Sequence, residues 1–184
     1  METEIKQAVI LAGGKGERLR PYTDTMPKPM YPIHGIPFIV RLILQIKSFG
    51  IKRIVVLLGY LAEKIIAELG DGSRLGVQII YDTTPAEYDT GERLVHAEGL
   101  LDNRFLLMYC DNFCPLDFEK MERRFLESKA EAQITAYANK DAYTRGNLKI
   151  QDGIVKIYDK SRQQDGLEQV DIGYVFLRKR VIAS

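Results

Sequence analysis

The sequence predicts an α/β fold in which helices pack on a mostly parallel central sheet, with antiparallel strands added toward the C-terminus. Two observations support this prediction. Short apolar runs alternate with helix-spaced apolar positions from residue 8 to residue 109, and from residue 147 onward short strands surround an Asp-Gly turn. At 184 residues and 46% hydrophobic content, the chain is long enough for one domain with a sizeable core.

The first part of the chain alternates strands and helices. Strands are expected at 8–12, 54–58, 77–81 and 105–109, where apolar and β-branched residues form short runs. Helices are expected between them, from Pro37 to the stop at Gly50, through Ile65, Ile66 and Leu69 to Gly70, and through Leu94, Ala97, Leu100 and Leu101. Strands separated by helices in this way predict a parallel sheet with helices on its faces.

The C-terminal part predicts antiparallel pieces. A helix is expected at 118–126, and strands are expected at 133–137 and 170–177. Further strands at 147–150 and 154–158 flank Gln151-Asp152-Gly153, in which Asp-Gly is a hairpin signal. Because no linker, internal repeat or low-complexity stretch interrupts the chain, residues 1–184 are expected to form one domain.

Composition excludes several classes of partner. Lys and Arg total 26 and Asp and Glu total 25, so a net charge of +1 predicts no broad attraction to nucleic acid or to an anionic membrane. The N-terminus lacks the apolar core of a signal peptide and no apolar run could span a bilayer, so a cytoplasmic location is expected. Cys110 and Cys114 lie far in sequence from His34 and His96, which gives little support to a zinc site and favours free, packed thiols.

The most informative stretch is the glycine loop at residues 11–21. Gly13, Gly14 and Gly16 follow the first strand and can turn backbone N–H groups toward an anion, because they lack a Cβ. Positive charge around them comes from Lys15, Arg18, Arg20 and Lys28. Pro27 and Pro29 are expected to hold Lys28 in an extended segment, because a residue that precedes proline is pushed out of the helical region. The loop therefore predicts a phosphate ligand.

Two well-known phosphate loops do not fit these residues. The dinucleotide fingerprint requires glycine or alanine three residues after its second glycine, and Leu19 stands at that place. The P-loop requires four residues between its glycines followed by Lys-Ser or Lys-Thr, and the chain has no such run. A different class of phosphate-binding loop is therefore expected.

The pattern Leu-Ala-Gly-Gly-x-Gly-x-Arg-Leu-x-Pro at 11–21, followed by Pro-Lys-Pro-Met at 27–30, resembles the signature of the sugar-1-phosphate nucleotidylyltransferases. Later matches are Thr90-Gly91 and Asp111, which follows the fourth strand. Gly146 stands at the family's sugar-binding glycine, Asp159-Lys160 resembles its Glu-Lys pair, and Asp171-x-Gly173 resembles its Asn-x-Gly step. The resemblance implies a Rossmann-like three-layer α/β/α sandwich of the nucleotide-diphospho-sugar transferase type.

The resemblance also implies a reaction and a role for each motif. A sugar 1-phosphate attacks the α-phosphorus of an NTP, pyrophosphate leaves, and a nucleotide sugar for cell-surface glycan biosynthesis is formed. Arg18 and Lys28 are the implied catalytic residues, and Asp111 is the implied ligand of Mg²⁺. The nucleotide-binding residues would be Leu11, Ala12, Gly13, Gly14, Lys15, Gly16, Thr90 and Gly91, and the sugar-phosphate-binding residues would be Gly146, Asp159, Lys160 and Asp171.

Each of the less central assignments has a structural alternative. Thr90 is interpreted either as the N-cap of the helix that follows or as a ligand-binding residue. Asp111 could instead cap the turn after its strand, and Lys160 could be an exposed lysine on a solvated turn. The stretch 90–94 resembles that of cytidylyltransferases and short uridylyltransferases, which leaves the base open.

Two departures from the family pattern bear on function. Cys110 replaces the glycine that usually precedes the metal-binding aspartate, and the chain ends at Ser184, before the family's second such aspartate. A domain shortened at its C-terminus is therefore expected, with Asp171 as the candidate for the second carboxylate. The competing hypothesis is a regulatory domain of the same fold that binds nucleotide sugar without catalysis. The partners expected for the enzyme are an NTP and a sugar 1-phosphate, and homo-oligomer formation is compatible with it.

Overall fold

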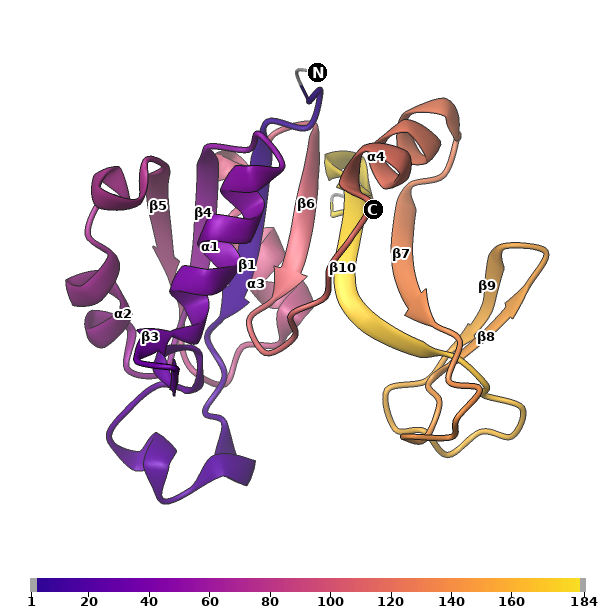
Figure 1. Ribbon diagram of the computed structural model, residues 1–184, viewed down its shortest axis with the longest axis horizontal. Coiled ribbons are helices and arrows are strands. Elements are labelled where there is room, and N and C mark those ends of the chain that lie inside the picture. Colours follow the sequence, from indigo (N-terminus) through magenta and orange to yellow (C-terminus); the bar gives the residue numbers. More distant parts are fainter. Residues whose placement is uncertain (1–2, 183–184) are drawn as a thin grey trace.

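A six-stranded mixed sheet forms the centre of the structure, which is a computed structural model that describes residues 3–182 (Figure 1). Four parallel strands, β5, β4, β1 and β6, are followed by β10, which is antiparallel to both β6 and the edge strand β7. Their bounds are β1 Gln7–Ala12, β4 Arg53–Leu58, β5 Gln78–Thr83, β6 Arg104–Tyr109, β7 Ala132–Tyr137 and β10 Val170–Arg178. The predicted parallel sheet with antiparallel additions is confirmed.

Helices cover both faces of this sheet. One face packs against α1 (Phe38–Ser48), α2 (Ala62–Leu69) and α4 (Phe118–Glu127), and the other packs against α3 (Thr90–His96). Along β1 the side chains alternate between these two layers, Ile10 facing one cluster and Val9 the other. Every residue of β1 is buried, which explains why its sequence is apolar from Ala8 to Ala12 instead of alternating. The three-layer α/β/α arrangement is confirmed.

The third helical run is interrupted. The sequence predicts helical residues as far as Leu101, but α3 ends at His96 and a 3-10 turn, Glu98–Leu100, follows it. At its start, the Asp89 carboxylate accepts a hydrogen bond from Glu92 N, and the Glu92 carboxylate accepts one from Asp89 N. Asp89 is therefore the N-cap, and the interpretation of Thr90 as that cap is wrong.

Two small hairpins stand outside the main sheet. The first pairs β2 (Pro32–Ile33) with β3 (Ile36–Pro37), and the second pairs β8 (Leu148–Gln151) with β9 (Ile154–Tyr158). Asp152 and Gly153 connect β8 and β9 with φ values of 51° and 73°. Positive φ at both turn residues is the condition for a type I′ hairpin, so the Asp-Gly prediction is confirmed. Figure 1 shows this hairpin beyond the edge formed by β7 and the lower part of β10.

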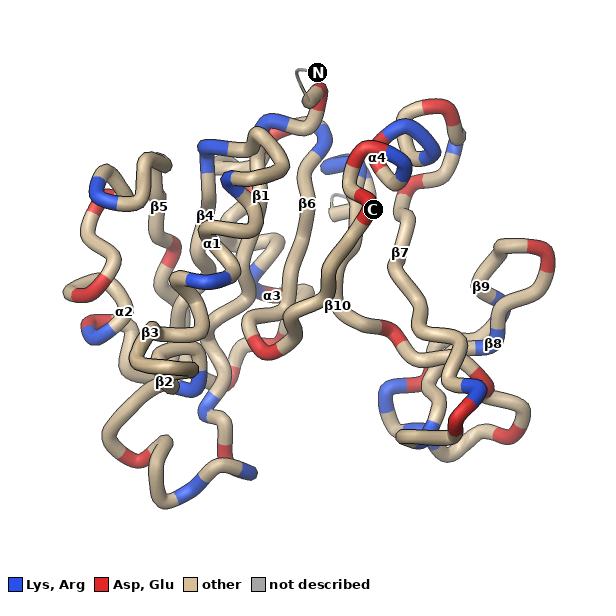
Figure 2. Tube along the Cα trace, in the orientation of Figure 1, with Lys and Arg blue, Asp and Glu red and all other residues tan. Residues whose placement is uncertain are grey.

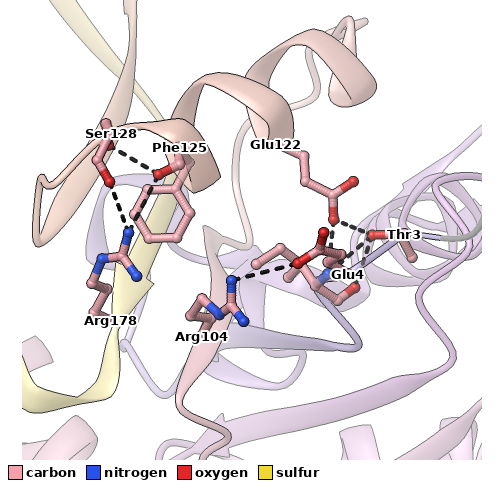
Figure 3. A network of polar contacts seen from close by, with 8 residues as sticks. Thr3, Glu4, Arg104, Glu122, Phe125, Ser128 and Arg178 are labelled. Atoms are coloured by element: carbon pink, nitrogen blue, oxygen red, sulfur yellow. Dashed lines mark hydrogen bonds and ion pairs between the residues drawn. The ribbon is translucent and has the colours of Figure 1, made fainter.

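The amino ends of the parallel strands are held together by polar contacts (Figure 3). The Glu122 carboxylate on α4 accepts hydrogen bonds from the Thr3 hydroxyl and, at 2.7 Å, from Ile5 N. Arg178, at the end of β10, donates to backbone carbonyls near the end of α4 and lies 5.0 Å from the Phe125 ring centroid. These contacts lie at the amino ends of the parallel strands, whereas the glycine loop lies at their carboxyl ends. Within residues 3–182, no helix combines the length and the apolar character needed to cross a membrane.

Candidate active site

The strand order reverses between β1 and β6. From β1 the order runs outward through β4 to β5, whereas from β6 it runs the other way to β10 and β7. In open α/β sheets, ligands bind beyond the carboxyl ends of the two strands that flank such a reversal. The glycine loop follows β1 and Asp111 follows β6, so the fold places both predicted motifs on the two sides of this point.

The glycine loop leaves β1 and turns at Gly16. Leu11 and Ala12 are buried at the end of the strand, while Gly14 is exposed. Gly16 has φ 64° and ψ 33°, and a Cβ there would lie 3.0 Å from Lys28 Cβ. The buried Thr23 hydroxyl donates to the Gly16 carbonyl at 3.1 Å. Gly16 thus meets both conditions that favour glycine, a left-handed backbone and a close neighbour.

A cavity of about 420 Å³ opens beside this loop, and its walls carry the predicted cations. It is lined by Lys15, Gly16, Glu17, Arg18, Leu19, Lys28 and Ala86. Lys15 forms an ion pair with Glu87 at 3.2 Å, and Arg20, outside the lining, pairs with Asp24 at 3.3 Å. Arg18 has no ion-pair partner among the described residues 3–182. Its exposed guanidinium is available to an anion in the cavity.

Lys28 and Asp111 meet across the reversal point. Lys28 Nζ lies 2.7 Å from Asp111 Oδ2, although 83 positions separate the two residues in sequence. The extended conformation predicted for Lys28 is wrong, because Lys28 begins a 3-10 turn, Lys28–Met30, that Tyr31 N closes with a 3.1 Å hydrogen bond to Lys28 O. Proline fits the first turn of a helix, where no backbone donor is required, so Pro29 does not prevent the turn.

The Asp111 carboxylate has the oxygen chemistry of a ligand for a divalent cation. Its side chain is 35% exposed, and only one of its carboxylate oxygens contacts Lys28. No group of three or more His, Cys, Asp or Glu residues gathers anywhere in residues 3–182 in a way that could hold a metal. Mg²⁺ usually takes only one or two protein carboxylates and completes its shell with water and substrate phosphates. A single carboxylate at this point therefore fits a divalent cation that completes its shell with water and phosphate oxygens.

Cys110 precedes Asp111 but turns away from the cavity. Its side chain packs with the apolar layer that contains α1, whereas the neighbouring Tyr109 packs with the layer that contains α3. Burial, followed by the nearby charge of Asp111, raises the pKa of the Cys110 thiol to about 12. Both cysteines are free, so the interpretation of packed, unpaired thiols is confirmed. The Cys110 side chain therefore lies on the core side of the segment that follows β6.

The residues predicted for the sugar phosphate lie around the β8–β9 hairpin, in the segment 146–171, which we call the lobe. The Asp159 carboxylate accepts four hydrogen bonds from its own turn, from the Ser161 hydroxyl and the backbone N–H groups of residues 161, 163 and 164. These bonds, that of the Ser161 hydroxyl first, hold the pKa of Asp159 far below its usual range. Lys160 follows on the same turn, exposed and with no ion pair to any residue in 3–182. Figure 2 shows positive charge in this lobe and in the loop below β1, both beyond the carboxyl ends of the parallel strands.

Asp171 lies where β10 bends away from the sheet. Its carboxylate accepts hydrogen bonds from the Tyr158 hydroxyl at 2.9 Å and from Gly173 N at 2.8 Å. Burial, followed by the charge of Asp171, raises the pKa of Tyr158. Gly173 has φ 78°, and a Cβ there would lie 2.6 Å from Tyr109 Cδ2. The bend therefore requires glycine and brings Asp171 and Tyr158 close to the end of β6.

The comparison with known sequences agrees with this geometry. The sequence model of the nucleotidyl transferase family matches residues 7–183, nearly the whole chain. The chain belongs to the nucleotidyl transferase family. The fold and the family predicted from the glycine loop are thereby confirmed.

Relatives within this family carry names that specify different bases. Mannose-1-phosphate guanylyltransferase of Mycobacterium tuberculosis is 32% identical over 97% of this chain and 50% of its own length. N-acetylmuramate alpha-1-phosphate uridylyltransferase of Neisseria meningitidis serogroup B is 40% identical over 61% of this chain and 49% of its own length. The crystal structure of HddC from Yersinia pseudotuberculosis superposes with a TM-score of 0.79 at 29% identity, covering 97% of this chain and 79% of that one. The chain spans about half the length of these two curated relatives.

One residue behind the glycine loop was missed by sequence reasoning. Arg93, on α3, is only 4% exposed, and its guanidinium donates to the backbone carbonyls of Leu58 and Gly13. A signal was present, because Arg93 stands four residues before Ala97, on the buried side of the helix. A cation in an apolar helical stripe indicates a buried polar contact instead of a solvated face.

Gly146 leads to a prediction about the segment that precedes β8. A Cβ at Gly146 would lie 2.2 Å from Leu167 O, a backbone atom that cannot rotate away. We expect Gly146→Ala to lower the free energy of unfolding by about 1–3 kcal/mol, the usual cost of overpacking a close contact. Urea denaturation measures this change.

The matched control for that substitution is Gly99→Ala. A Cβ at Gly99 would meet nothing within 4 Å, so its stability is expected to stay within about 0.5 kcal/mol of the wild type. Equal stability of the Gly146→Ala protein and the wild type would contradict the close backbone contact.

Proposed function

We propose that this chain carries the catalytic site of a sugar-1-phosphate nucleotidylyltransferase. Such an enzyme joins a sugar 1-phosphate to the nucleoside monophosphate part of an NTP, releases pyrophosphate and forms a nucleotide sugar for cell-surface glycan biosynthesis. The observation that carries the proposal is the Lys28–Asp111 pair, 2.7 Å apart at the strand-order reversal and next to the glycine loop. Family membership supports the same reading.

In the proposed reaction, the glycine loop holds the triphosphate. Backbone N–H groups of Gly14 to Gly16 lie in an exposed or half-exposed loop where they can donate to phosphate oxygens. Arg18 lines the same cavity and forms no ion pair with any residue in 3–182. We assign Arg18 to the departing pyrophosphate, because its charge can stabilise negative charge that grows on the leaving group.

Lys28 and Asp111 are assigned to the reacting phosphates. Lys28 bridges them as a cation, and the Asp111 carboxylate is the residue that would hold Mg²⁺ with the phosphate oxygens of the nucleotide. When bound, the ion would supply positive charge that reduces the repulsion between the negative phosphates and the anionic nucleophile.

The sugar phosphate requires no strong general base. A phosphate monoester with a second pKa near ~6 is largely dianionic at neutral pH, so its oxygen is already a nucleophile that needs positioning and charge screening. We assign the positioning to Lys160 and the surrounding lobe, where Asp159 holds the turn and Asp171 and Tyr158 form a polar wall near the end of β6.

The alternative is a regulatory domain that binds nucleotide sugar without catalysis. Two observations favour catalysis: Arg18 has no ion-pair partner within residues 3–182, and Lys28 contacts Asp111. Binding alone requires fewer charges directed at the transition state. The base remains open, since the related proteins are named for guanylyl and uridylyl transfer.

The deciding experiment is an assay of pyrophosphate release with Mg²⁺. UTP, CTP, GTP, ATP and dTTP are each combined with a panel of neutral, amino and acidic sugar 1-phosphates. A nucleotide sugar formed with stoichiometric pyrophosphate supports the enzyme. Tight binding of a nucleotide sugar with no product from any pair supports the regulatory domain.

Lys160 yields a separate prediction. If its ammonium group binds the sugar phosphate, Lys160→Ala raises the KM for the sugar 1-phosphate by about 10- to 150-fold, because one charge-assisted contact contributes about 1.5–3 kcal/mol. The KM for the nucleotide stays nearly unchanged, because the glycine loop lies elsewhere in the sequence and structure. Steady-state kinetics with each substrate varied in turn measures both constants.

Lys156 on β9 provides the control for Lys160, since it is another exposed lysine of the same lobe. Lys156→Ala is expected to leave both KM values as they are. Equal changes of both constants in Lys160→Ala, or no change in either, would assign Lys160 to a solvated turn.

A further inference from the structure

Arg93 is a buried cation directly behind the glycine loop. Its guanidinium forms five hydrogen bonds, to the Thr84 hydroxyl and to the carbonyls of Leu58, Gly13, Pro85 and Ala86. No carboxylate in residues 3–182 forms an ion pair with it. One side chain thus joins the end of β4, the segment after β5 and the loop after β1.

The neighbouring glycines are fitted to this guanidinium. A Cβ at Gly13 would lie 2.4 Å from Arg93 Cζ, and a Cβ at Gly59 would lie 2.8 Å from Arg93 Nη2. Neither glycine needs its unusual freedom of φ, because neither has a positive φ value. Their lack of a side chain instead provides the room for Arg93, so two glycines near the site and the buried arginine form one unit.

The contact with Gly13 determines where the next donor points. The Gly13 carbonyl accepts hydrogen bonds from Arg93 Nη2 at 3.3 Å and from Tyr60 N at 3.1 Å. In a trans peptide the C=O and the following N–H point in opposite directions from one rigid plane. With the Gly13 carbonyl held against the protein, the N–H of Gly14 points in the opposite direction within that plane, away from Arg93.

We propose that Arg93 is a positioning residue for the nucleotide, which directs the Gly14 N–H toward the triphosphate and fixes segment 84–86 beside the glycine loop. The proposal rests on the nucleotide site assigned above. Ala86 lines the same cavity as Lys15 and Arg18, so the fixed segment also forms a wall of that site. The positive charge of Arg93 lies in a poorly solvated place, where it acts on an anion in the loop with little screening.

Arg93→Lys tests this role, because lysine retains the charge but loses the planar fork that reaches five acceptors. Its matched control is Arg178→Lys. Arg178 also donates to backbone carbonyls, those of Phe125, Ala130 and Ser128, but it lies at the amino ends of the parallel strands, far from the glycine loop (Figure 3). Both substitutions are expected to lower the melting temperature.

The two variants differ in nucleotide binding. The probe is the Mg²⁺ complex of each of ATP, CTP, GTP, UTP and dTTP, measured by calorimetry on the full chain. For the nucleotide that the wild type binds most tightly, we expect Arg93→Lys to raise the Kd at least tenfold and Arg178→Lys to leave it within twofold. The KM for the sugar 1-phosphate is expected to stay unchanged in both.

A second, milder variant keeps the test decisive if Arg93→Lys does not fold. Thr84→Val removes one acceptor of the guanidinium with almost no change of shape, and we expect it to raise the nucleotide Kd at least threefold. If Arg93→Lys folds and its nucleotide Kd lies within twofold of the wild-type value, the positioning role is overturned and Arg93 is a structural arginine. If Arg93→Lys does not fold, the same result for Thr84→Val overturns the role. A wild type that binds nucleotide but forms no product would refute the proposed function alone, whereas one that binds no nucleotide would refute both.

Discussion

Replacing Arg18 with alanine is expected to lower kcat for nucleotide-sugar formation by about 10²- to 10³-fold, the usual loss when one electrostatic group at a reacting centre is removed. The nucleotide Kd is expected to change only a few-fold. Arg18 lines the cavity beside the glycine loop and has no ion-pair partner in residues 3–182, so no carboxylate there neutralises its charge. The charge it faces is greatest when pyrophosphate departs, which is why turnover suffers more than binding.

The control for Arg18 is Arg20, two residues away. Arg20 is exposed, as Arg18 is, but it forms an ion pair with Asp24 at 3.3 Å and does not line the cavity. Arg20→Ala should therefore retain kcat within a few-fold. Single-turnover kinetics separates the chemical step from product release, and calorimetry gives the Kd. Full turnover in Arg18→Ala combined with a large loss of affinity would make Arg18 an anchor of bound nucleotide instead of a catalytic residue.

Most of the sheet could be predicted because its signals are local. The strands ending at Ala12, Leu58 and Tyr109 are short apolar runs followed by glycine or polar residues, and such runs fit only a buried sheet. Because these strands alternate with helices, they are expected to be parallel, and their carboxyl ends then meet at the same end of the sheet. The association of the glycine loop with Asp111 was therefore available from sequence.

The contacts that the sequence did not predict depend on neighbours distant along the chain. The turn at Lys28 is fixed by a hydrogen bond from Tyr31 and by an ion pair with Asp111, which outweigh the local preference of a residue before proline. Arg93 is buried because Leu58, Gly13 and the 84–86 segment present carbonyls around it. Those acceptors come from three different elements, and no spacing along the helix specifies them.

Glycines show the same limit. Gly16 and Gly153 have positive φ and follow turn patterns that sequence reasoning can use. Gly13, Gly59 and Gly146 instead leave space for atoms of other segments, an arginine in two cases and the backbone of Leu167 in the third. Motif resemblance pointed to Gly146 as a sugar-binding residue, while the structure adds the packing reason for a glycine there.

The substitution Asp111→Asn is expected to reduce Mg²⁺-dependent turnover by about 10³-fold or more, because charge stabilisation by a bound metal supplies several kcal/mol and each tenfold in rate corresponds to about 1.4 kcal/mol. Asparagine preserves the shape of the side chain and can still accept a hydrogen bond from Lys28 Nζ. The ion pair itself contributes little to stability, because both side chains are about a third exposed, at 29% and 35%. The melting temperature should consequently stay within a few degrees of the wild type.

A surface ion pair of the same kind provides the control for Asp111. Asp24→Asn removes the carboxylate that pairs with Arg20 at 3.3 Å, outside the cavity, and should change neither turnover nor its dependence on Mg²⁺ concentration. Activity is measured over a range of Mg²⁺ concentrations beside circular dichroism and a thermal melt. An Asp111→Asn protein that unfolds would assign the carboxylate to holding the turn after β6, and a folded one with full activity would remove it from the site. Loss of activity in a folded protein, with Asp24→Asn unaffected, is the result that a metal-binding carboxylate requires.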